Sequence, residues 1–454
     1  MNSSMPLAGL DSRTGVGTFG IPPELALDFE AFKATLSPEE QRALTVLAAG
    51  MKHQSAEEFI GNIPEEEILN AHERRVFAAE MAREVPEKRS PSAKFVMVLK
   101  ATRLCNLRCT YCRSWAEGHN QVMSFPVLVR AIREVLSMRG LQHVEIVWHG
   151  GEITLLKPKF FKKLIWVQQQ FRRPGQVIRI SLQTNATHLT DEWIEFLSTL
   201  NIGVGISIDG PPEVHDRRRV DKDGKPSSPL VVEGIRRLRT AGIPHGALVV
   251  VDRFLQDIGA ERLLTYFHEI GLKNLDFLNI VPENHKGATA SREDGFICFD
   301  EYVDFLREAF DVWWRKYRDE MFITTFADLI PALSDGAKPN NCYWAGNCMV
   351  STLTIEANGD MAPCDKFIGD EGSIFGNVMR QSIADVMRQT AYIKNANRER
   401  ASSLSRMKTC DFFQICQGGC PHDRLVNRRH VPDHDPDCCG LKPLVRHIRD
   451  AAMA

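Results

Sequence analysis

The sequence has no long run of apolar residues and no excess of charge of one sign. No apolar stretch reaches the ~20 residues that a helix needs to cross a bilayer, and the first residues lack the basic-then-apolar order of a signal peptide. Lys and Arg number 56 against 58 Asp and Glu, which gives a net charge of −2. With no long basic run either, nothing favours binding to nucleic acid or to an anionic membrane. The expected setting is therefore the cytoplasm.

Cysteine, in contrast, is plentiful, with twelve residues. Disulfides are rare in a reducing compartment, so cysteines that cluster along the chain indicate metal or redox ligands. Three lie between residues 105 and 112, and eight lie between residues 342 and 439. This distribution predicts two metal-binding regions.

The chain divides by pattern into four expected parts. Residues 1–90 predict a helical N-terminal module, with a capping signature at Ser37–Glu40 and a charged, Pro-containing linker near its end. Residues 91–298 alternate strand-like and helical patterns, and residues 299–340 predict a helical bridge. Residues 341–454 are loop-rich, and such a unit needs metal ligation in place of a large core.

Six β/α units are predicted in the second part, which makes the fold class α/β. Alternating strands and helices imply a parallel sheet, either open and doubly wound or closed into a barrel of fewer than eight strands. In both arrangements the chemistry belongs at the C-terminal ends of the strands. The predicted strands are 95–100, 144–148, 177–182, 204–208, 247–251 and 275–280.

A C-x3-C-x2-C loop follows the first predicted strand. Its cysteines are Cys105, Cys109 and Cys112. Three thiolates can hold three irons of a four-iron cubane, which leaves the fourth iron open to a substrate or cofactor. A zinc loop without its fourth ligand and a set of packed thiols are the alternatives.

This loop, with Tyr111 before its last cysteine, resembles the signature of the radical S-adenosylmethionine (SAM) superfamily. The resemblance implies a partial (β/α)6 TIM-like barrel and a catalytic [4Fe–4S] cluster whose open iron chelates SAM. It also implies one-electron cleavage of SAM to a 5′-deoxyadenosyl radical that abstracts a substrate hydrogen. A donor such as flavodoxin or ferredoxin would supply the electron.

Motifs after the next three strands also resemble that superfamily. Gly150-Gly151-Glu152 resembles its GGE motif, Gln183-Thr184-Asn185 its T-N segment, and Ser207-Ile208-Asp209-Gly210 its S-x-D-G segment. By this resemblance the residues that contact SAM would be Tyr111, Gly150, Gly151, Glu152, Asn185, Ser207 and Arg219. Asp209 is a catalytic candidate that either orients its neighbours or faces the substrate. The other interpretations are a simple turn, strand-end capping by Asn185 and Ser207, and a solvated face for Arg219.

The C-terminal cysteines resemble the SPASM extension of radical SAM enzymes, which commonly binds two auxiliary [4Fe–4S] clusters. By that resemblance the first cluster would be held by Cys342, Cys348, Cys364 and Cys420, and the second by Cys410, Cys416 and Cys438. A zinc-ribbon module is the alternative, although ribbons favour C-x2-C pairs, which this region lacks.

The second set departs from the SPASM pattern in one ligand. The usual block opens C-x2-C, but the residue three before Cys410 is Met407, a poor ligand for a cubane iron. Three outcomes stay open: an iron without a protein ligand, a substitute such as Cys439, Asp411 or His434, or no cubane at all. The expected number of auxiliary clusters is therefore one or two.

Enzymes of this kind mostly modify side chains of peptides or proteins, and auxiliary clusters that remove electrons suggest a net oxidation. The expected function is a peptide maturase that forms a cross-link in a ribosomally made precursor peptide. The enzymatic alternative is formation of formylglycine on a protein such as a sulfatase. A non-catalytic iron–sulfur or zinc scaffold is the alternative of another class, and it would release no 5′-deoxyadenosine.

Overall fold

The structure is a computed structural model that describes most of the chain. The described residues are 37, 41, 56–85, 88–90, 92–119, 121–281, 295–339, 341–346, 348–367, 371–388, 390–430 and 435–452. The chain divides into one unit of residues 1–54 and a second unit of residues 55–454. In the first unit the Gln41 amide donates to the Ser37 carbonyl at 2.9 Å, the spacing of a helical turn beginning at Ser37. The rest of the helical module expected before residue 56 lies outside the described residues.

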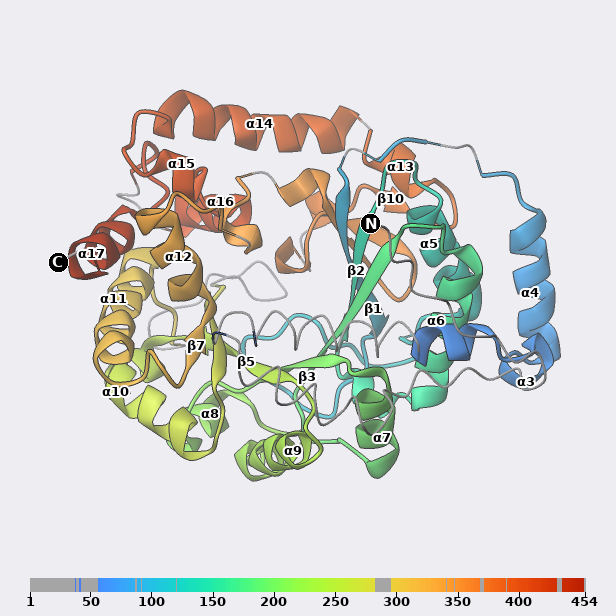
Figure 1. Ribbon diagram of the computed structural model, residues 1–454, viewed down its shortest axis with the longest axis horizontal. Helices are drawn as coiled ribbons and strands as arrows, with labels where there is room; N and C mark the ends of the chain where they lie inside the picture. The colour runs from blue at the N-terminus through green and yellow to red at the C-terminus, as the bar shows by residue number, and fades with distance from the viewer. Residues whose placement is uncertain are drawn as a thin grey trace, which may run out of the picture. The chain divides into compact units, whose positions relative to one another are not determined.

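Within the described part of the second unit the strands form one sheet of ten, and six of them are the predicted ones (Figure 1). They are β1 (Lys94–Thr102), β2 (His143–Gly150), β3 (Val177–Thr184), β4 (Gly203–Ser207), β5 (His245–Val251) and β6 (Asn274–Asn279). These six pair in sequence order and are all parallel, and the short β7 (Phe322–Ile323) follows β6. The predicted boundaries lie within two residues of the observed ones, and the partial (β/α)6 TIM-like fold is confirmed.

Helices connect the strands around the outside of the curved sheet (Figure 1). In α5, Leu128, Ile132 and Val135 recur at helical spacing and are fully buried, so this face packs into the core. The helices of the barrel are α5 (Phe125–Leu136), α6 (Pro158–Phe171), α7 (Asp191–Leu200), α8 (Pro212–Arg218), α9 (Ser228–Thr240) and α10 (Arg253–Glu269), with a 3-10 turn η1 (Ile153–Leu155). The expected bridge contains α11 (Phe299–Lys316) and α12 (Thr324–Ser334).

The C-terminal part continues the sheet of the barrel instead of forming a separate one. Strand β8 (Thr352–Ile355) pairs parallel to β1, and β9 (Asp360–Ala362) and β10 (Gly376–Asn377) follow in antiparallel order. Around them lie η2 (Cys342–Trp344), η3 (Cys348–Val350), η4 (Asp365–Phe367), η5 (Glu371–Ser373), α13 (Ile383–Val386), α14 (Thr390–Met407), α15 (Phe413–Cys416), α16 (Pro421–His430) and α17 (Lys442–Ala452). The cysteine-rich segments are thereby fixed against the first strand of the barrel.

Helices α3 (Glu65–Ile68) and α4 (Ala71–Ala82) come before the barrel in the chain and pack on its outer helices. The buried Glu80 of α4 accepts hydrogen bonds from Arg83 at 2.7 Å and from Arg130 of α5 at 2.9 Å. The Trp166 indole of α6 donates to the Ile63 carbonyl at 2.9 Å. This segment therefore covers α5 and α6.

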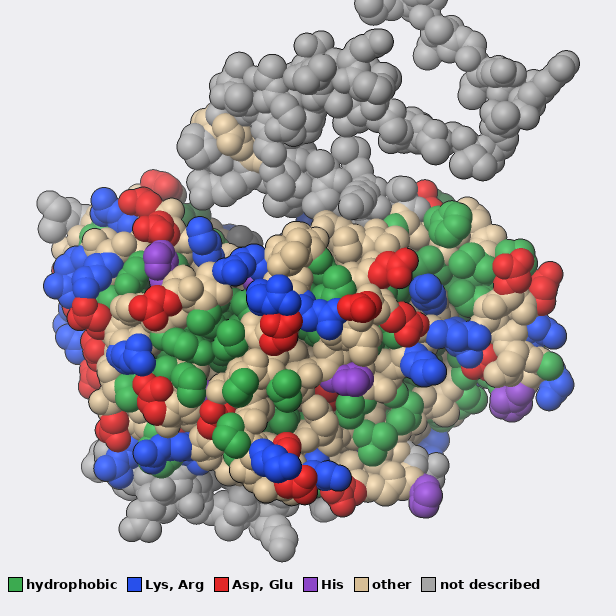
Figure 2. Space-filling model, turned by 90° about the horizontal axis from the view of Figure 1, so that it is seen from below, with side chains coloured by type: hydrophobic (Ala, Val, Ile, Leu, Met, Phe, Trp, Pro, Cys, Tyr) green, Lys and Arg blue, Asp and Glu red, His purple; other side chains and the backbone are tan. Residues whose placement is uncertain are grey.

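On the face shown in Figure 2, Lys and Arg side chains are interspersed with Asp and Glu side chains. Within the described ranges, no helix combines the length and the apolar character needed to cross a membrane.

Candidate active site

The loop after β1 carries Cys105, Cys109 and Cys112 at the C-terminal end of the barrel. Its backbone is fixed by bonds from Arg108 to the Val220 carbonyl at 2.7 Å and from Thr110 to the Arg218 carbonyl at 3.0 Å. None of the three cysteines forms a disulfide. The backbone of the loop is therefore held in place by the chain that follows β4.

Backbone amides point at two of the three sulfurs. The Leu107 amide lies 3.3 Å from the Cys105 sulfur, and the Ser114 amide lies 3.3 Å from the Cys112 sulfur. Such N–H···S bonds stabilise thiolate ligands and tune a cluster. Burial raises the pKa of Cys105 and Cys109 to about 12, so these thiols need a metal to lose their protons at neutral pH. A three-thiol donor set of this kind fits an iron–sulfur cluster.

The Gly-Gly-Glu motif packs on the backbone of the cysteine loop. A Cβ at Gly150 would lie 2.1 Å from the Thr102 carbonyl oxygen, and one at Gly151 would lie 2.3 Å from that of Leu104. The Gly151 and Glu152 amides donate to the same two carbonyls, each at 2.8 Å. The glycines therefore allow β2 to approach the cysteine loop. Their expected contact with SAM stays a prediction.

Glu152 ties the end of β2 to the end of β3. Its side chain is buried, with the residue 1% exposed. The carboxylate accepts bonds from the Thr154 amide at 2.9 Å, the Thr154 hydroxyl at 2.6 Å, the Thr184 hydroxyl at 2.7 Å and the Asn185 amide at 2.7 Å. These bonds give Glu152 a structural role, and its contact with the SAM ammonium stays a prediction.

Asn185 and Ser207 lie at the ends of the next two strands. The Asn185 side-chain nitrogen is 3.9 Å from the Cys105 sulfur and donates to Asn106 at 2.9 Å. The Ser207 hydroxyl accepts a bond from Gln183 at 2.8 Å. Asn185 therefore lies beside the cysteine loop as expected, and the roles of both residues toward SAM stay predictions.

Asp209 and Arg219 form a buried, two-pronged ion pair beneath the loop. The Arg219 Nε and Nη2 atoms lie 2.8 and 3.0 Å from the two Asp209 oxygens. The Tyr111 hydroxyl donates to Asp209 at 2.6 Å, and the Val250 amide does so at 3.2 Å. Burial alone would raise the pKa of Asp209, but the charge and hydrogen bonds of Arg219, together with His215 and the Tyr111 hydroxyl, outweigh it and the pKa is lowered. Of the two roles left open for Asp209, this geometry supports orientation of Tyr111 and the loop.

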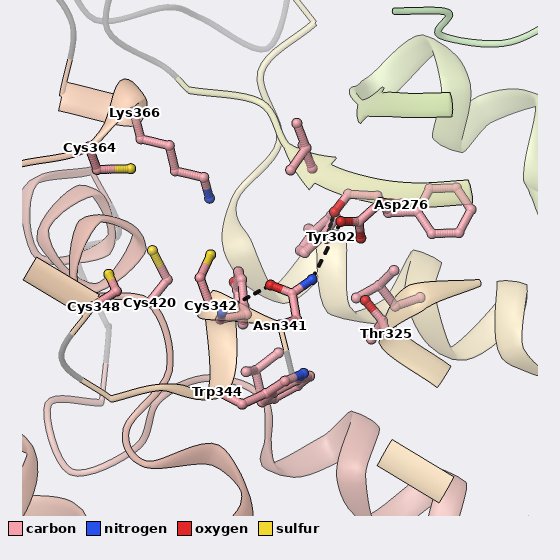
Figure 3. Close-up of a pocket in the computed structure, with 15 residues that line it drawn as sticks. Asp276, Tyr302, Thr325, Asn341, Cys342, Trp344, Cys348, Cys364, Lys366 and Cys420 are labelled. Carbon is pink, nitrogen blue, oxygen red and sulfur yellow. Dashed lines mark hydrogen bonds between the residues drawn. The ribbon is translucent and has the colours of Figure 1, made fainter. Parts of the chain in front are cut away.

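Four C-terminal cysteines meet at one cavity of about 120 Å³ (Figure 3). Cys342, Cys348 and Cys420 point their sulfurs into the same space, and Cys364, the residue before η4, also lines it. These are the four residues expected to hold the first auxiliary cluster. A set of four soft thiolates around an enclosed space fits a [4Fe–4S] cluster.

The second set of cysteines is arranged differently. Cys416 and Cys439 are buried, and the Cys439 thiol lies within hydrogen-bonding reach of the sulfurs of Cys416 and Cys438. Its interaction with Cys438 is the main reason why the pKa of Cys438 is lowered to about 6. Met407 is 4% exposed within the hydrophobic core, and its carbonyl accepts from the Cys410 amide at 2.9 Å.

Three residues were considered as the ligand that Met407 cannot supply, and they lie in different environments. Cys439 lies with Cys416 and Cys438, Asp411 is exposed, and His434 lies outside the described residues. Of these, Cys439 fits best as a further ligand.

One charged group between the barrel and the C-terminal cysteines was not predicted from the sequence. Asp365, directly after Cys364, forms an ion pair with Lys100 of β1, and its other oxygen lies 3.6 Å from His149 Nε2 at the end of β2. Lys100 is fully buried, and its ammonium also donates to Ser114 in the cysteine loop at 3.0 Å. A lysine inside an otherwise apolar strand is a signal that could have revealed this group.

Comparisons with known proteins agree with this geometry. The family described as the radical SAM superfamily matches residues 99–257, and the SPASM iron–sulfur cluster-binding domain matches residues 342–421. A serine-type anaerobic sulfatase-maturating enzyme of Bacteroides thetaiotaomicron is 33% identical over 384 residues, which are 79% of this chain and 91% of the relative. A cysteine-type anaerobic sulfatase-maturating enzyme of Clostridium novyi is 26% identical over 73% of this chain and 89% of its own.

A solved structure shares the architecture. Native anSMEcpe with bound AdoMet and the Cp18Cys peptide aligns with a TM-score of 0.68 at 25% identity, over 79% of this chain and 97% of that one. Together with the two domain matches, it supports SAM and more than one [4Fe–4S] cluster as the cofactors. The chain therefore belongs to the radical SAM superfamily, as an enzyme with a SPASM extension and relatives among the anaerobic sulfatase-maturating enzymes.

Proposed function

We propose that this enzyme oxidises a seryl or cysteinyl side chain of a protein substrate to formylglycine. The proposal is supported by similarity over 91% of a serine-type sulfatase-maturating enzyme. It is also supported by the anSMEcpe structure, which contains bound AdoMet and the Cp18Cys peptide. The observation that carries it is the position of Asp365, beside a predicted cluster ligand and against the ends of β1 and β2.

The reaction removes two electrons and two protons from the side chain. From serine this gives the aldehyde directly, whereas from cysteine it gives a thioaldehyde, which water converts to the aldehyde with release of hydrogen sulfide. Bound SAM and its cluster supply the chemistry that removes the first hydrogen atom. One proton and one electron must then leave the substrate carbon and its heteroatom. Asp365 can accept that proton, and Cys364, the preceding residue, would hold the auxiliary cluster, which would supply an acceptor for the electron.

The surroundings of Asp365 keep its carboxylate charged. Burial alone would raise the pKa of Asp365, but Lys100 and His149 outweigh it and the pKa is lowered. Burial also lowers the pKa of His149 to about 4, so the imidazole is neutral at neutral pH. The Asp365 side chain is 32% exposed, which leaves it open to a bound peptide.

The cross-link in a precursor peptide, expected from the sequence, receives less support than formylglycine from these relatives. Both reactions remove two hydrogens from a seryl substrate, so mass alone does not separate them. Only formylglycine carries an aldehyde that reacts with a hydrazide probe. The electron donor, flavodoxin or ferredoxin, stays a prediction.

Asp365→Asn is the variant that tests the proposal. Reconstituted wild-type enzyme should convert a sulfatase active-site peptide carrying Ser or Cys into a hydrazide-reactive product and release 5′-deoxyadenosine. Asp365→Asn should still release 5′-deoxyadenosine but form about a hundredfold less aldehyde, the lower end of the range for loss of a proton acceptor. Asp450→Asn, an exposed carboxylate on α17, is the matched control. SAM cleavage without aldehyde from wild-type enzyme on either peptide would contradict the proposal.

A further inference from the structure

A lysine shares the cavity of the first auxiliary site with the four cysteines. Lys366 lies two residues after Cys364 in η4, and its side chain extends toward the space that the cysteine sulfurs face (Figure 3). The proposed oxidation of substrate and the expected binding of SAM do not involve this side chain. A positive charge in the cavity therefore suggests a further role for Lys366.

The ammonium of Lys366 is held in place by rigid partners. It lies 3.0 and 3.1 Å from the two oxygens of Asp423 in α16, and 5.5 Å from the centre of the Tyr343 ring. Asp423 is itself fixed by the Tyr343 hydroxyl, which donates at 2.7 Å, and by His422 at 3.2 Å. A lysine held this firmly presents its charge at a defined point on the wall of the cavity.

We propose that Lys366 raises the reduction potential of the first auxiliary cluster. A four-thiolate cluster becomes more negative by one charge when it takes up an electron. A fixed positive charge in a partly dry cavity stabilises that reduced state more than the oxidised one. The lysine thus makes this cluster a better acceptor for the single electron that leaves the substrate radical. The inference requires the cluster but does not depend on which bond the enzyme forms.

The test is a redox titration of the auxiliary clusters, followed by electron paramagnetic resonance. We would use full-length protein carrying Cys105→Ala, Cys109→Ala and Cys112→Ala, so that the signal of the barrel cluster is absent. In this background Lys366→Met should make reduction of one cluster at least tenfold less favourable, a shift of ~59 mV to lower potential for a one-electron couple. Lys366→Arg keeps the charge and should restore most of the potential. Lys394→Met, an exposed lysine on α14, should change nothing.

Asp423→Asn tests the direction of the shift in reduction potential. This test does not depend on whether the Lys366→Met variant binds its cluster. Removing the anion leaves Lys366 uncompensated, so the same cluster should become easier to reduce. Iron content measured on every variant shows that the cluster is present. An unchanged potential in iron-replete Lys366→Met, or a lower potential in Asp423→Asn, would overturn the proposal. Because no substrate is added, either result leaves the formylglycine reaction to be judged by its own test.

Discussion

The barrel and the C-terminal part present their cysteines in opposite ways. In the barrel, three cysteines lie on one short loop, and the loop is shaped by backbone contacts with β2 and by the buried Asp209–Arg219 pair below it. In the C-terminal part, the cysteines come from segments far apart in sequence and meet only in the folded chain. The first site therefore depends on precise local backbone packing, and the second region depends on the ligands themselves to hold it together.

Gly151→Ala should break the barrel site and leave the C-terminal sites intact. The new Cβ would lie 2.3 Å from the Leu104 carbonyl oxygen and 2.6 Å from that of Arg103, so the cysteine loop must shift. We expect SAM cleavage to fall about a hundredfold, as for displacement of a reacting group by about 1 Å. Gly203→Ala is the control, because its Cβ would meet nothing within 4 Å. Equal rates of 5′-deoxyadenosine formation in the two variants would contradict the assigned role of Gly151.

Arg219→Met should destabilise the barrel by leaving Asp209 buried without its cation. Removal of one partner from a buried ion pair costs about 3–5 kcal/mol. Denaturant unfolding of the variant would measure this loss. Arg236→Met breaks the exposed Arg236–Glu233 pair and should change the unfolding midpoint little. A similar midpoint for both variants would mean that the buried pair does not support the loop.

Cys439→Ser and Cys438→Ser sharpen the comparison within the C-terminal part. If Cys439 takes the place that Met407 leaves open, both variants should lose up to about four irons. If the second cluster has an iron without a protein ligand, only Cys438→Ser should lose them. Iron and sulfide analysis of the two variants beside Cys298→Ser separates these results, since Cys298 caps α11 and belongs to neither set. An unchanged iron content in both Cys438→Ser and Cys439→Ser would show that neither cysteine is a ligand of the second auxiliary cluster.

The contrast between the barrel and the C-terminal part also explains which features could be predicted from the sequence. The strands of the barrel and the cysteine loop were predictable, because apolar runs with regular spacing and a contiguous motif are local signals. The meeting of Cys342, Cys348, Cys364 and Cys420 came from resemblance to a family and not from spacing, because their contacts are long-range. The Lys100–Asp365 and Lys366–Asp423 pairs were not predicted, since each joins residues more than fifty positions apart. The extension of the barrel sheet by β8 was missed for the same reason.

The most direct test of the account compares wild-type protein with the Cys105/Cys109/Cys112 triple Ala variant after anaerobic reconstitution. Iron and sulfide content, Mössbauer spectra and 5′-deoxyadenosine would be measured on both. We predict a loss of about four irons and the complete loss of SAM cleavage, with the auxiliary clusters retained. SAM cleavage that survives in the variant, or zinc in place of iron in the wild-type protein, would contradict the central claim.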